Sequence, residues 1–517
     1  MMKAARRATS LRAFSTPDTS AATVKPFQSI PGNWKGMMPL IGVAPIFLPY
    51  VVKEADGGGL LTEDFLKDQY DRYGRDTGIS QFGPSSEKCA IVYDEGYLQV
   101  FQKEGKYPSG ILEGAWPIKQ YNEKYAKESP PNPFLERGET WRKGRMAINP
   151  YLFNIQAAQS YLDPINETAR SAAEHFEDFA TTGRFDQFCE LAAFDMFTAA
   201  ALGVQLNSVG SDPKGLHYFK EIHGGIGTMV KVTTNCPYSK LDMFKFGAWD
   251  GFVSEWDRGR KAGTELVESV MEGKLGTGTG IMHGFLNDES LKISREEATE
   301  MYLILTFASA DTTAGFINNA LSNIAKHPSV QDKIRAELEA ELGGQDYHPN
   351  HGKDGQPVKL NYLQQVLKES QRVTPTLPFV NVKNDIPKDL VINGYHVPAG
   401  TTVIFSHMGI ATDQTLAGPN PHLFDPDRFS DEAVAARKGT RAEFLDHPVA
   451  CKPFGFGSRM CVGSRIAKLE YTSILCRILQ DYVMTYDEAA NANLNSRRIA
   501  HTTTIERPCP TFKVTKL

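Results

Sequence analysis

One stretch constrains the fold more than any other, because residues 294–327 predict a single long helix that is apolar on almost every side. Ser294 with Glu297 three residues later forms a capping box, which marks a helix N-terminus, and the helical pattern continues to Pro328. At about 1.5 Å per residue the helix would be roughly 50 Å long. Since a helix that is apolar all round must be surrounded by other elements, the sequence predicts a large core that this helix crosses.

The rest of the chain indicates a mainly α fold with small β-sheets. The middle and the C-terminal part are largely helical in pattern, and short strand-like runs such as LVINGYHV and TTVIFSHM stand between turns. With 41% hydrophobic and 23% charged residues over 517 positions, the composition is that of a globular protein. Length alone would allow about three domains of ~150 residues, and one large domain stays open.

Charge and cysteine usage exclude some classes of protein. A formal net charge of −5 offers no basic field of the kind that nucleic-acid binders use, so we expect no nucleic-acid partner. The seven cysteines are scattered, odd in number and free of any C-x-x-C pair, which argues against a disulfide framework or a zinc knuckle and favours a reducing compartment. They are Cys89, Cys189, Cys236, Cys451, Cys461, Cys476 and Cys509.

The N-terminus has the composition of a mitochondrial transit peptide. Residues 1–25 carry four lysines and arginines before the first acidic residue, Asp18, with serine, threonine and alanine between them. A disordered basic tail is the alternative. The apolar run at residues 38–52 is too short, and too often broken by proline, to span a membrane. We expect it to pack on the body of the protein or to make a peripheral membrane contact.

Polar residues interrupt the long helix at its centre. Asp311, Thr312 and Thr313 follow a run of apolar residues and precede another. A buried carboxylate is costly unless it is paired or hydrogen-bonded. The patch therefore needs either a structural partner or a function.

A second helix is predicted to begin at an Asn361 cap, with Gln364 three residues on, and to end before Pro375. Glu369 and Arg372 share one face of this helix. Taken alone, such a pair is an ordinary surface ion pair.

The segment PFGFGSRMCVGSR, residues 453–465, places one cysteine at the start of a third predicted helix. Unpaired N–H groups and the helix dipole favour an anion there, so we expect the Cys461 thiol to ionise more easily than usual. Gly455, Gly457 and Gly463 allow tight turns and a close approach to a flat partner, and Arg459 adds a positive charge.

Three kinds of chemistry could use this lone thiolate. A nucleophile needs a base within reach, and a structural zinc needs three further N or S ligands; the segment supplies neither. A haem iron needs only one axial protein ligand, and a thiolate donates electron density that favours O–O cleavage. A haem site therefore accounts for both the solitary cysteine and its place before a helix.

These residues resemble the cytochrome P450 family of haem-thiolate monooxygenases, and the resemblance covers nearly all of residues 26–517. The family's cysteine loop, F-x-x-G-x-R-x-C-x-G, is matched by Phe454, Gly457, Arg459, Cys461 and Gly463. Further motifs stand upstream in the family's order: W-x-x-x-R, the helix segment ASADTT with Ser309 at the usual glycine, E-x-x-R, and FDPDRF.

The resemblance implies one P450 domain over residues 26–517, with haem b between the long helix and the cysteine-loop helix and Cys461 as the axial ligand of the iron. It implies that Trp141 and Arg145 bind the haem together with the loop residues, and that Asp311 and Thr312 relay protons to O2. A buried structural network is implied for Glu369, Arg372 and Arg428. Lys383 is a candidate partner of a haem propionate, with an ordinary loop lysine as the alternative.

The resemblance is greatest to the mitochondrial branch of the family, which implies a peripheral location on the matrix side of the inner membrane. Members of this branch take electrons from an acidic iron–sulfur ferredoxin with an NADPH-dependent reductase, so a basic docking surface is expected. Its candidates are Lys368, Lys452, Arg465 and Lys468, with a solvated helix face as the alternative.

The segments that the family folds over the haem are largely apolar here, which suits a hydrophobic, sterol- or fatty-acid-like substrate. They include residues 221–232 and, as pocket candidates, Trp116, Leu377 and Phe379. Two other functions stay open: a haem-thiolate isomerase or dehydratase that acts on peroxides without O2, and a non-catalytic haem sensor. The acid–alcohol pair argues against the first, and a sensor would need no proton relay.

Overall fold

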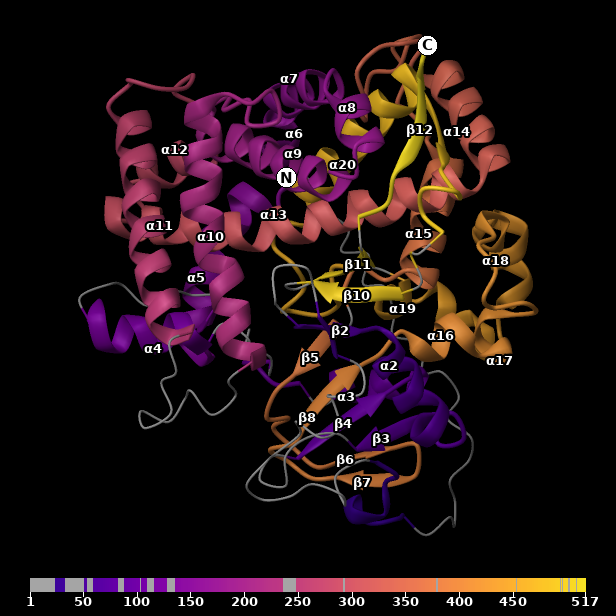
Figure 1. Ribbon diagram of the computed structural model, residues 1–517. Helices are drawn as coiled ribbons and strands as arrows, with labels where there is room; N and C mark the ends of the chain where they lie inside the picture. Colours follow the sequence, from indigo (N-terminus) through magenta and orange to yellow (C-terminus); the bar gives the residue numbers. More distant parts are fainter. Residues whose placement is uncertain are drawn as a thin grey trace, which may run out of the picture.

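The computed structural model describes residues 24–32, 51–53, 59–81, 88–102, 104–108, 116–127, 135–235, 248–291, 293–377, 380–451, 453–492, 494, 496–500, 503–507 and 509–517. Within them, the long helix α13 (Arg295–Lys326) runs across the molecule (Figure 1). In this view α7, α8 and α9 lie above α13, whereas strands β3–β8 lie below it together with shorter helices such as α16 and α17. The mainly α architecture with small sheets is therefore confirmed.

The helix α13 begins and ends where the sequence predicts. The Ser294 hydroxyl accepts a hydrogen bond from the Glu297 amide at 3.1 Å, and the Glu297 carboxylate accepts one from the Ser294 amide at 2.7 Å. This reciprocal capping box satisfies two amides that the first helical turn leaves without intrahelical partners. At the other end, Pro328 opens the next helix, α14 (Pro328–Glu341).

The other helices follow in chain order. They are α2 (Asp64–Gln69), α3 (Gln99–Gln102), α4 (Trp116–Tyr125), α5 (Gly138–Leu152), α6 (Ile155–Ser160), α7 (Leu162–Ala173), α8 (Phe176–Thr181), α9 (Phe185–Leu202), α10 (Pro213–Asn235), α11 (Ala248–Met271), α12 (Ile281–Asn287), α15 (Asn361–Val373), α16 (Met408–Thr412), α17 (Gln414–Ala417), α18 (Asp431–Arg437), α19 (Pro448–Cys451) and α20 (Ser464–Asp481).

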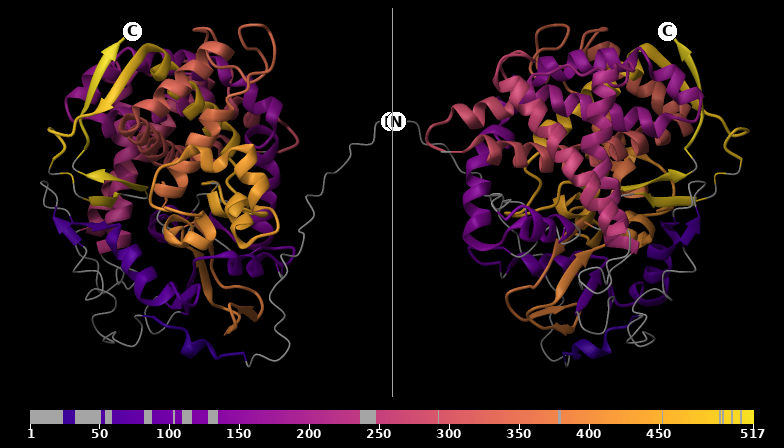
Figure 2. Two further views of the ribbon diagram at one scale, coloured as in Figure 1. Left: turned by 90° about the vertical axis from the view of Figure 1, so that its right-hand side faces the viewer. Right: turned by 60° about the vertical axis from the view of Figure 1, so that its left-hand side comes forward.

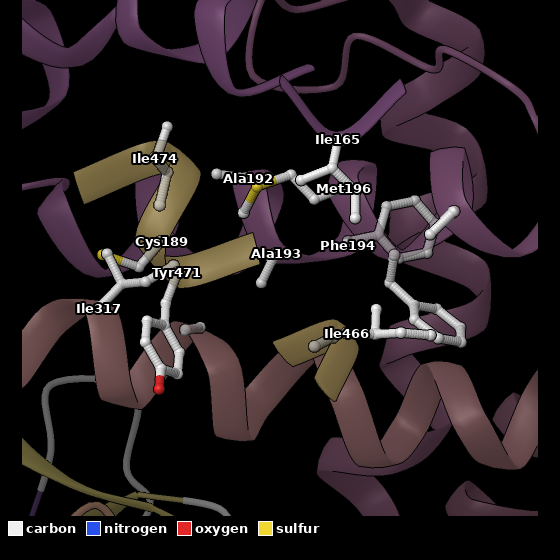
Figure 3. Packing of buried hydrophobic residues seen from close by; sticks show 14 of the residues in the cluster. Ile165, Cys189, Ala192, Ala193, Phe194, Met196, Ile317, Ile466, Tyr471 and Ile474 are labelled. Carbon is white, nitrogen blue, oxygen red and sulfur yellow. The ribbon is translucent and has the colours of Figure 1, made fainter. Parts of the chain in front are cut away.

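The main core forms where α9, α13 and α20 meet (Figure 3). Alanines 192 and 193 of α9 are fully buried, and their small side chains allow the helices to approach closely. Ile466 and Ile474 of α20 and Ile317 of α13 fill the space between the helices. The packing fixes α20, and with it the cysteine loop, against the long helix.

In the described part of the chain, the strands form four small sheets. Their orders are β1-β2-β10-β11, β3-β4-β8-β5, β6-β7 and β9-β12, and all pairings are antiparallel except that of β4 with β8. Figure 2 shows that β6–β8 lie at the opposite end of the molecule from β9 and β12. The strands are β1 (Val51–Lys53), β2 (Gly59–Thr62), β3 (Ile79–Gln81), β4 (Cys89–Val92), β5 (Val380–Lys383), β6 (Leu390–Ile392), β7 (Tyr395–Val397), β8 (Thr402–Phe405), β9 (Tyr482–Tyr486), β10 (Ser496–Ala500), β11 (Thr503–Arg507) and β12 (Phe512–Lys516).

The predicted strand run LVINGYHV is the hairpin β6–β7. Asn393 and Gly394 both have positive φ, 49° and 79°. Two such residues make the tight turn whose twist matches antiparallel strands, which is why an Asn-Gly pair stands there.

The start of α15 differs from the prediction. The residue at the N-cap is Leu360, not Asn361, and no side chain of α15 caps the helix. Glu337 of α14 does so instead, since its carboxylate accepts from the amides of Tyr362 and Leu363 at 2.7 and 2.9 Å. The local pattern located the helix but could not reveal a cap supplied by a neighbouring helix.

Two predictions concern segments outside this description. Residues 1–23, which carry most of the proposed transit peptide, and residues 38–50 of the apolar run are not among the described residues. Among the helices that the structure describes, none combines the length and the apolar character needed to cross a membrane.

Candidate active site

The cysteine loop is held in shape by its own backbone. The Cys461 amide donates to the Phe454 carbonyl at 2.8 Å, and Gly457 has a φ of 82°, which a residue with a side chain would rarely adopt. The Cys461 side chain is exposed, and the amides of Gly463 and Ser464 donate to its sulfur. The loop therefore presents an accessible sulfur at the N-terminus of α20.

The prediction that the Cys461 thiol ionises easily is wrong. Surrounding protein atoms raise the pKa of the Cys461 thiol above its ordinary value. The amides of Gly463 and Ser464 and the charge of Arg145 act in the opposite direction, but they do not outweigh the desolvation of the thiolate by these surrounding atoms. Helix position alone thus does not decide the charge state of this sulfur.

Residues from distant motifs converge on the loop. Arg145 of α5 donates from Nη1 to the Met460 carbonyl at 2.7 Å, directly before the cysteine. The Arg459 guanidinium lies 4.4 Å from the ring centre of Trp141, which is buried on α5. Arg459 also donates to the carbonyls of Pro108 and Glu136, at 3.1 and 3.2 Å. The structure therefore brings together Trp141, Arg145 and the cysteine loop.

Positive charge accumulates beside the sulfur. Burial, followed by repulsion from Arg137 and Arg145, lowers the pKa of Arg459 to about 10, and Glu104 only partly opposes this effect. Such a depressed arginine pKa indicates too little negative charge nearby. A group with carboxylates fits this place, and the two propionates of a haem beside one accessible sulfur meet that requirement.

Lys383 is not an ordinary loop lysine. It ends strand β5, its side chain is only 3% exposed, and its Nζ lies 2.5 Å from Oε1 of Glu104. Burial lowers the pKa of Lys383, while the Glu104 carboxylate opposes that effect. Sequence reasoning missed Glu104, because a residue 279 positions away leaves no local pattern that would pair it with Lys383.

Between its ends, the long helix α13 is accessible at one place, formed by Ala308, Ser309 and Thr312, which we call the opening in α13. Between residues 298 and 325 every side chain of α13 is buried except Ala308, Ser309 and Thr312. Positions 308 and 312 are one helical turn apart and lie on the same face. Thr312 donates from Oγ1 to the Ala308 carbonyl at 2.7 Å, and Ser309 donates to the Thr306 carbonyl at 3.2 Å. The predicted alcohol therefore stands in the one accessible patch of this stretch.

The predicted acid beside it is buried and paired. Asp311 is 4% exposed, and its Oδ1 lies 2.7 Å from Nε2 of His223 on α10. Sequence reasoning placed His223 in a segment that covers the site but did not connect it with Asp311. The two residues are 88 positions apart, so only the fold reveals the contact.

The residues assigned to a structural network do meet in the interior. Glu369 and Arg372 of α15 are fully buried, with Nη2–Oε1 and Nε–Oε2 distances of 2.6 and 2.8 Å. Arg428 approaches Oε1 of Glu369 at 3.4 Å, and the Asp425 amide donates to the same oxygen at 2.9 Å. The surface-pair interpretation of Glu369 and Arg372 is therefore wrong.

The candidates for the docking surface differ in exposure. Lys368 and Lys468 are exposed, whereas Arg465 is half-buried and donates from Nε to the Phe153 carbonyl at 2.5 Å. Lys452 lies outside the described residues.

Two of the pocket candidates, Trp116 and Leu377, pack against different core clusters. Trp116 is half-buried and stacks on Trp249, with ring centres 6.1 Å apart. Leu377 is half-buried against a second core cluster, and Phe379 lies outside the described residues.

Known structures share this fold. The retinoic acid-bound cyanobacterial CYP120A1 superposes with a TM-score of 0.69 at 17% identity, covering 96% of this chain and 100% of the other. The haem domain of cytochrome P450DA gives 0.70 at 18% identity, covering 96% and 99%.

Relatives at the sequence level are named as P450 enzymes. The probable cytochrome P450 49a1 of Drosophila melanogaster is 24% identical over 91% of this chain and 80% of its own length. The probable mitochondrial cytochrome P450 12b2 of the same fly is 25% identical, with 72% of each chain covered. The mitochondrial sterol 26-hydroxylase of Mus musculus is 27% identical over 74% of this chain and 72% of its own.

The sequence model of the family described as Cytochrome P450 matches residues 78–506, which include the cysteine loop, the opening in α13 and the buried network. With that match, this chain belongs to the cytochrome P450 family and is a haem-thiolate monooxygenase.

Proposed function

We propose that this monooxygenase uses haem b and O2 to hydroxylate a hydrophobic, sterol- or fatty-acid-like substrate, with electrons from a ferredoxin. In such a reaction O2, two electrons and two protons convert a C–H bond to C–OH and release one water. The bound haem supplies the iron at which O2 is activated, and its thiolate ligand favours O–O cleavage. Residues 26–517 form the catalytic domain in this proposal.

The opening in α13 carries the proposal. A hydroxyl group, Thr312, stands in the accessible patch of an otherwise buried stretch, directly after the buried carboxyl Asp311. A hydroxyl that both accepts and donates can pass a proton from a carboxyl to a reacting oxygen. In this role Asp311 supplies the proton and the Thr312 Oγ1 delivers it.

The cysteine loop orients the sulfur toward the cofactor. Amides of Gly463 and Ser464 donate to Cys461, and Arg145 adds a positive charge nearby. These groups favour the thiolate that a haem iron requires. Arg459 and Arg145 still have N–H groups beyond those that bond backbone carbonyls, and these suit haem propionates.

The reduced, carbon monoxide-bound absorption spectrum tests the ligand. A thiolate-ligated haem absorbs far to the red of a histidine-ligated one, so the wild type shows the red-shifted band and Cys461→His loses it. Cys451→Ser and Cys476→Ser keep the band, because both sulfurs are buried away from the accessible loop. A wild-type protein without the band contradicts the proposed cofactor.

Thr312→Ala tests the proton relay. Loss of the hydroxyl diverts electrons to hydrogen peroxide, so peroxide released per NADPH consumed rises, whereas Thr312→Ser stays near the wild type. Thr306→Ala is the matched control, since Thr306 makes the same bond to its own helix but is buried, with Oγ1 2.8 Å from the Tyr302 carbonyl. Equal peroxide yields in Thr312→Ala and the wild type contradict the relay.

Exposed lysines support a ferredoxin as donor. Lys468 follows the cysteine loop on α20, and Lys368 is exposed on α15. The charge reversal Lys468→Glu should raise the KM for an acidic ferredoxin and should make this KM depend less on salt concentration. Lys220→Glu, on the exposed side of α10, is the control. A haem isomerase or dehydratase, by contrast, would turn over without NADPH, ferredoxin and reductase.

Relatives support the substrate class and the location. One of them is named a mitochondrial sterol 26-hydroxylase and two are named as mitochondrial P450s, which accords with a transit peptide in residues 1–25 and a peripheral place on the matrix side of the inner membrane. Spectral titration of the holoenzyme with cholesterol and with lauric acid tests the substrate class. A fusion of residues 1–25 to a fluorescent protein tests the location.

A further inference from the structure

A histidine and a carboxyl from different helices meet beside the opening in α13. Nε2 of His223 lies 2.7 Å from Oδ1 of Asp311, and the two side chains are 10% and 4% exposed. The pair joins α10 to α13 one residue before Thr312. This contact between His223 and Asp311 links the substrate-covering segment at residues 221–232 directly to the proposed proton donor.

Burial makes this contact consequential. A carboxylate in such a place is costly unless it is paired, and removing one partner of a buried pair destabilises the other. Burial alone lowers the pKa of His223, but the charge and the hydrogen bond of Asp311, with the charge of Glu190, outweigh it and raise this pKa above the ordinary value. The imidazole is therefore suited to fix the position of the Asp311 carboxyl through this contact.

The imidazole ring is itself fixed in position. Phe219, one turn earlier on α10, stacks on it with ring centres 4.8 Å apart and planes at 16°. The charge of Glu190 acts on it from α9. From α11, Arg258 pairs with Glu221 at 2.9 Å and Glu255 lies beside Gly224, so these two charges face the neighbours of His223.

Close packing of α10 on α11 fixes the backbone at this point. A Cβ on Gly225 would lie 3.1 Å from the Trp256 ring, and one on Gly259 would lie 2.9 Å from the Glu221 carbonyl. Glycine at both places lets the helices approach closely (Figure 1). Since α10 packs this closely on α11 and Phe219 stacks on the ring, the position of α10 determines where the His223 nitrogen stands.

We propose that His223 is a positioning residue of the proton relay: it holds Oδ1 of Asp311 so that the carboxyl stays beside Thr312. This rests on the proposed role of Asp311 and Thr312. His223 touches neither substrate nor cofactor in this role and acts only through Asp311. The geometry of α10 is thereby coupled to proton delivery.

The test compares His223→Phe, which keeps a ring but no donor, with His223→Gln, which keeps an N–H donor. Holoenzyme with saturating ferredoxin, its reductase and NADPH is assayed with cholesterol as the probe, in H2O and in D2O. His223→Phe should slow NADPH consumption by about ten- to a hundredfold, because small misplacements of a catalytic group have effects of that size, and should raise the solvent isotope effect. His223→Gln should recover much of the rate.

Controls separate this inference from the proposed relay. Asp311→Asn should resemble His223→Phe, and the double variant should be no slower than Asp311→Asn alone, because one residue acts through the other. Arg258→Gln, on α11, breaks the neighbouring α10–α11 ion pair with Glu221 and should behave as the wild type. If Asp311→Asn leaves the rate and isotope effect unchanged, the relay itself fails; if only the His223 variants do so, the inference fails alone.

Thermal unfolding provides a readout without turnover. Because the folded protein raises the pKa of His223, the pair contributes stability that is fully present below the unfolded pKa of about 6.5 and is lost as pH rises through the folded pKa. His223→Gln should lose that pH dependence. A lower melting temperature with an unchanged isotope effect would show a purely structural pair and overturn the inference.

Discussion

Replacing Glu369 by Gln should destabilise the protein, because Glu369 is the carboxylate that Arg372 and Arg428 share in the buried network. The substitution keeps the size of the side chain and removes its charge. Arg372 and Arg428 then remain buried with their shared counter-charge gone, at 0% and 7% side-chain exposure. Backbone carbonyls, including those of Pro421 and Leu423 at 2.5 and 3.0 Å from Arg372, still accept hydrogen bonds but carry no net charge.

The magnitude follows from two opposing effects. Unit charges about 4 Å apart attract by about 4 kcal/mol at an effective dielectric constant of about 20. Glu369 makes two such interactions, at 2.6 Å to Arg372 and 3.4 Å to Arg428. Desolvation of the carboxylate offsets part of this, and the net cost of breaking a buried pair is about 3–5 kcal/mol. With about 2 cal/mol/K of unfolding entropy per residue, the melting temperature should fall by about 3–5 °C.

Differential scanning fluorimetry of the holoprotein measures this fall. Asp68→Asn is the matched control, because Asp68 pairs with Arg72 at 2.9 Å on the surface, with side chains 37% and 63% exposed. Such an exposed helix pair contributes about 0.3–0.5 kcal/mol, and its loss should barely change the melting temperature. The melting temperature of Glu369→Gln should therefore lie about 3–5 °C below that of Asp68→Asn. If the two variants melt within about 1 °C of each other, the shared carboxylate does not compensate the two arginines.

Four further changes test other parts of the structure. Burial raises the pKa of Glu470 to about 8, so stability should fall as pH rises from about 4.5 to 8, and Glu470→Gln should abolish this fall in thermal melts at stepped pH. Parallel pH curves would contradict it. A Cβ on Gly409 would lie 2.0 Å from the Tyr93 carbonyl, so Gly409→Ala should cost about 1–3 kcal/mol in urea unfolding. Gly251→Ala, with no atom within 4 Å, should instead stabilise α11 by about 0.5–1 kcal/mol. Asn154 accepts from the amides of residues 156 and 157 at 2.8 and 3.3 Å, so Asn154→Ala should cost about 1 kcal/mol; an unchanged urea midpoint would show that the cap is not needed.

Features written in consecutive residues could be predicted well. The capping box of Ser294 and Glu297 located α13, because it depends on a few neighbouring side chains. The Asn-Gly pair of the β6–β7 hairpin is an equally local signal, although LVINGYHV is predicted only as a strand-like run. The cysteine loop is similar, since its glycines and its amide bonds lie within a dozen positions. Such features are formed mainly by local chemistry.

Partners from distant parts of the chain could not be predicted in this way. Asn361 offers a plausible cap for α15, yet the described structure uses Glu337 from the preceding helix. The residues around Lys383 have the composition of a loop, yet Lys383 is buried and paired with Glu104. In both cases the side chain that satisfies a buried or terminal group comes from another element, and tertiary packing selects it.

The charges of the two central groups illustrate the same division. Local chemistry identified Cys461 and Asp311: it predicted an easily ionised thiol from the helix N-terminus, and it predicted a partner or a function for the carboxyl. The fold then adds what the local pattern lacks: protein atoms raise the pKa of the sulfur, and a histidine from α10 pairs with the carboxyl. Motifs therefore indicate which atoms can react, whereas the fold supplies the surroundings and the distant partners of those atoms. Variants of His223 should for this reason change proton delivery although no motif of the family contains that position.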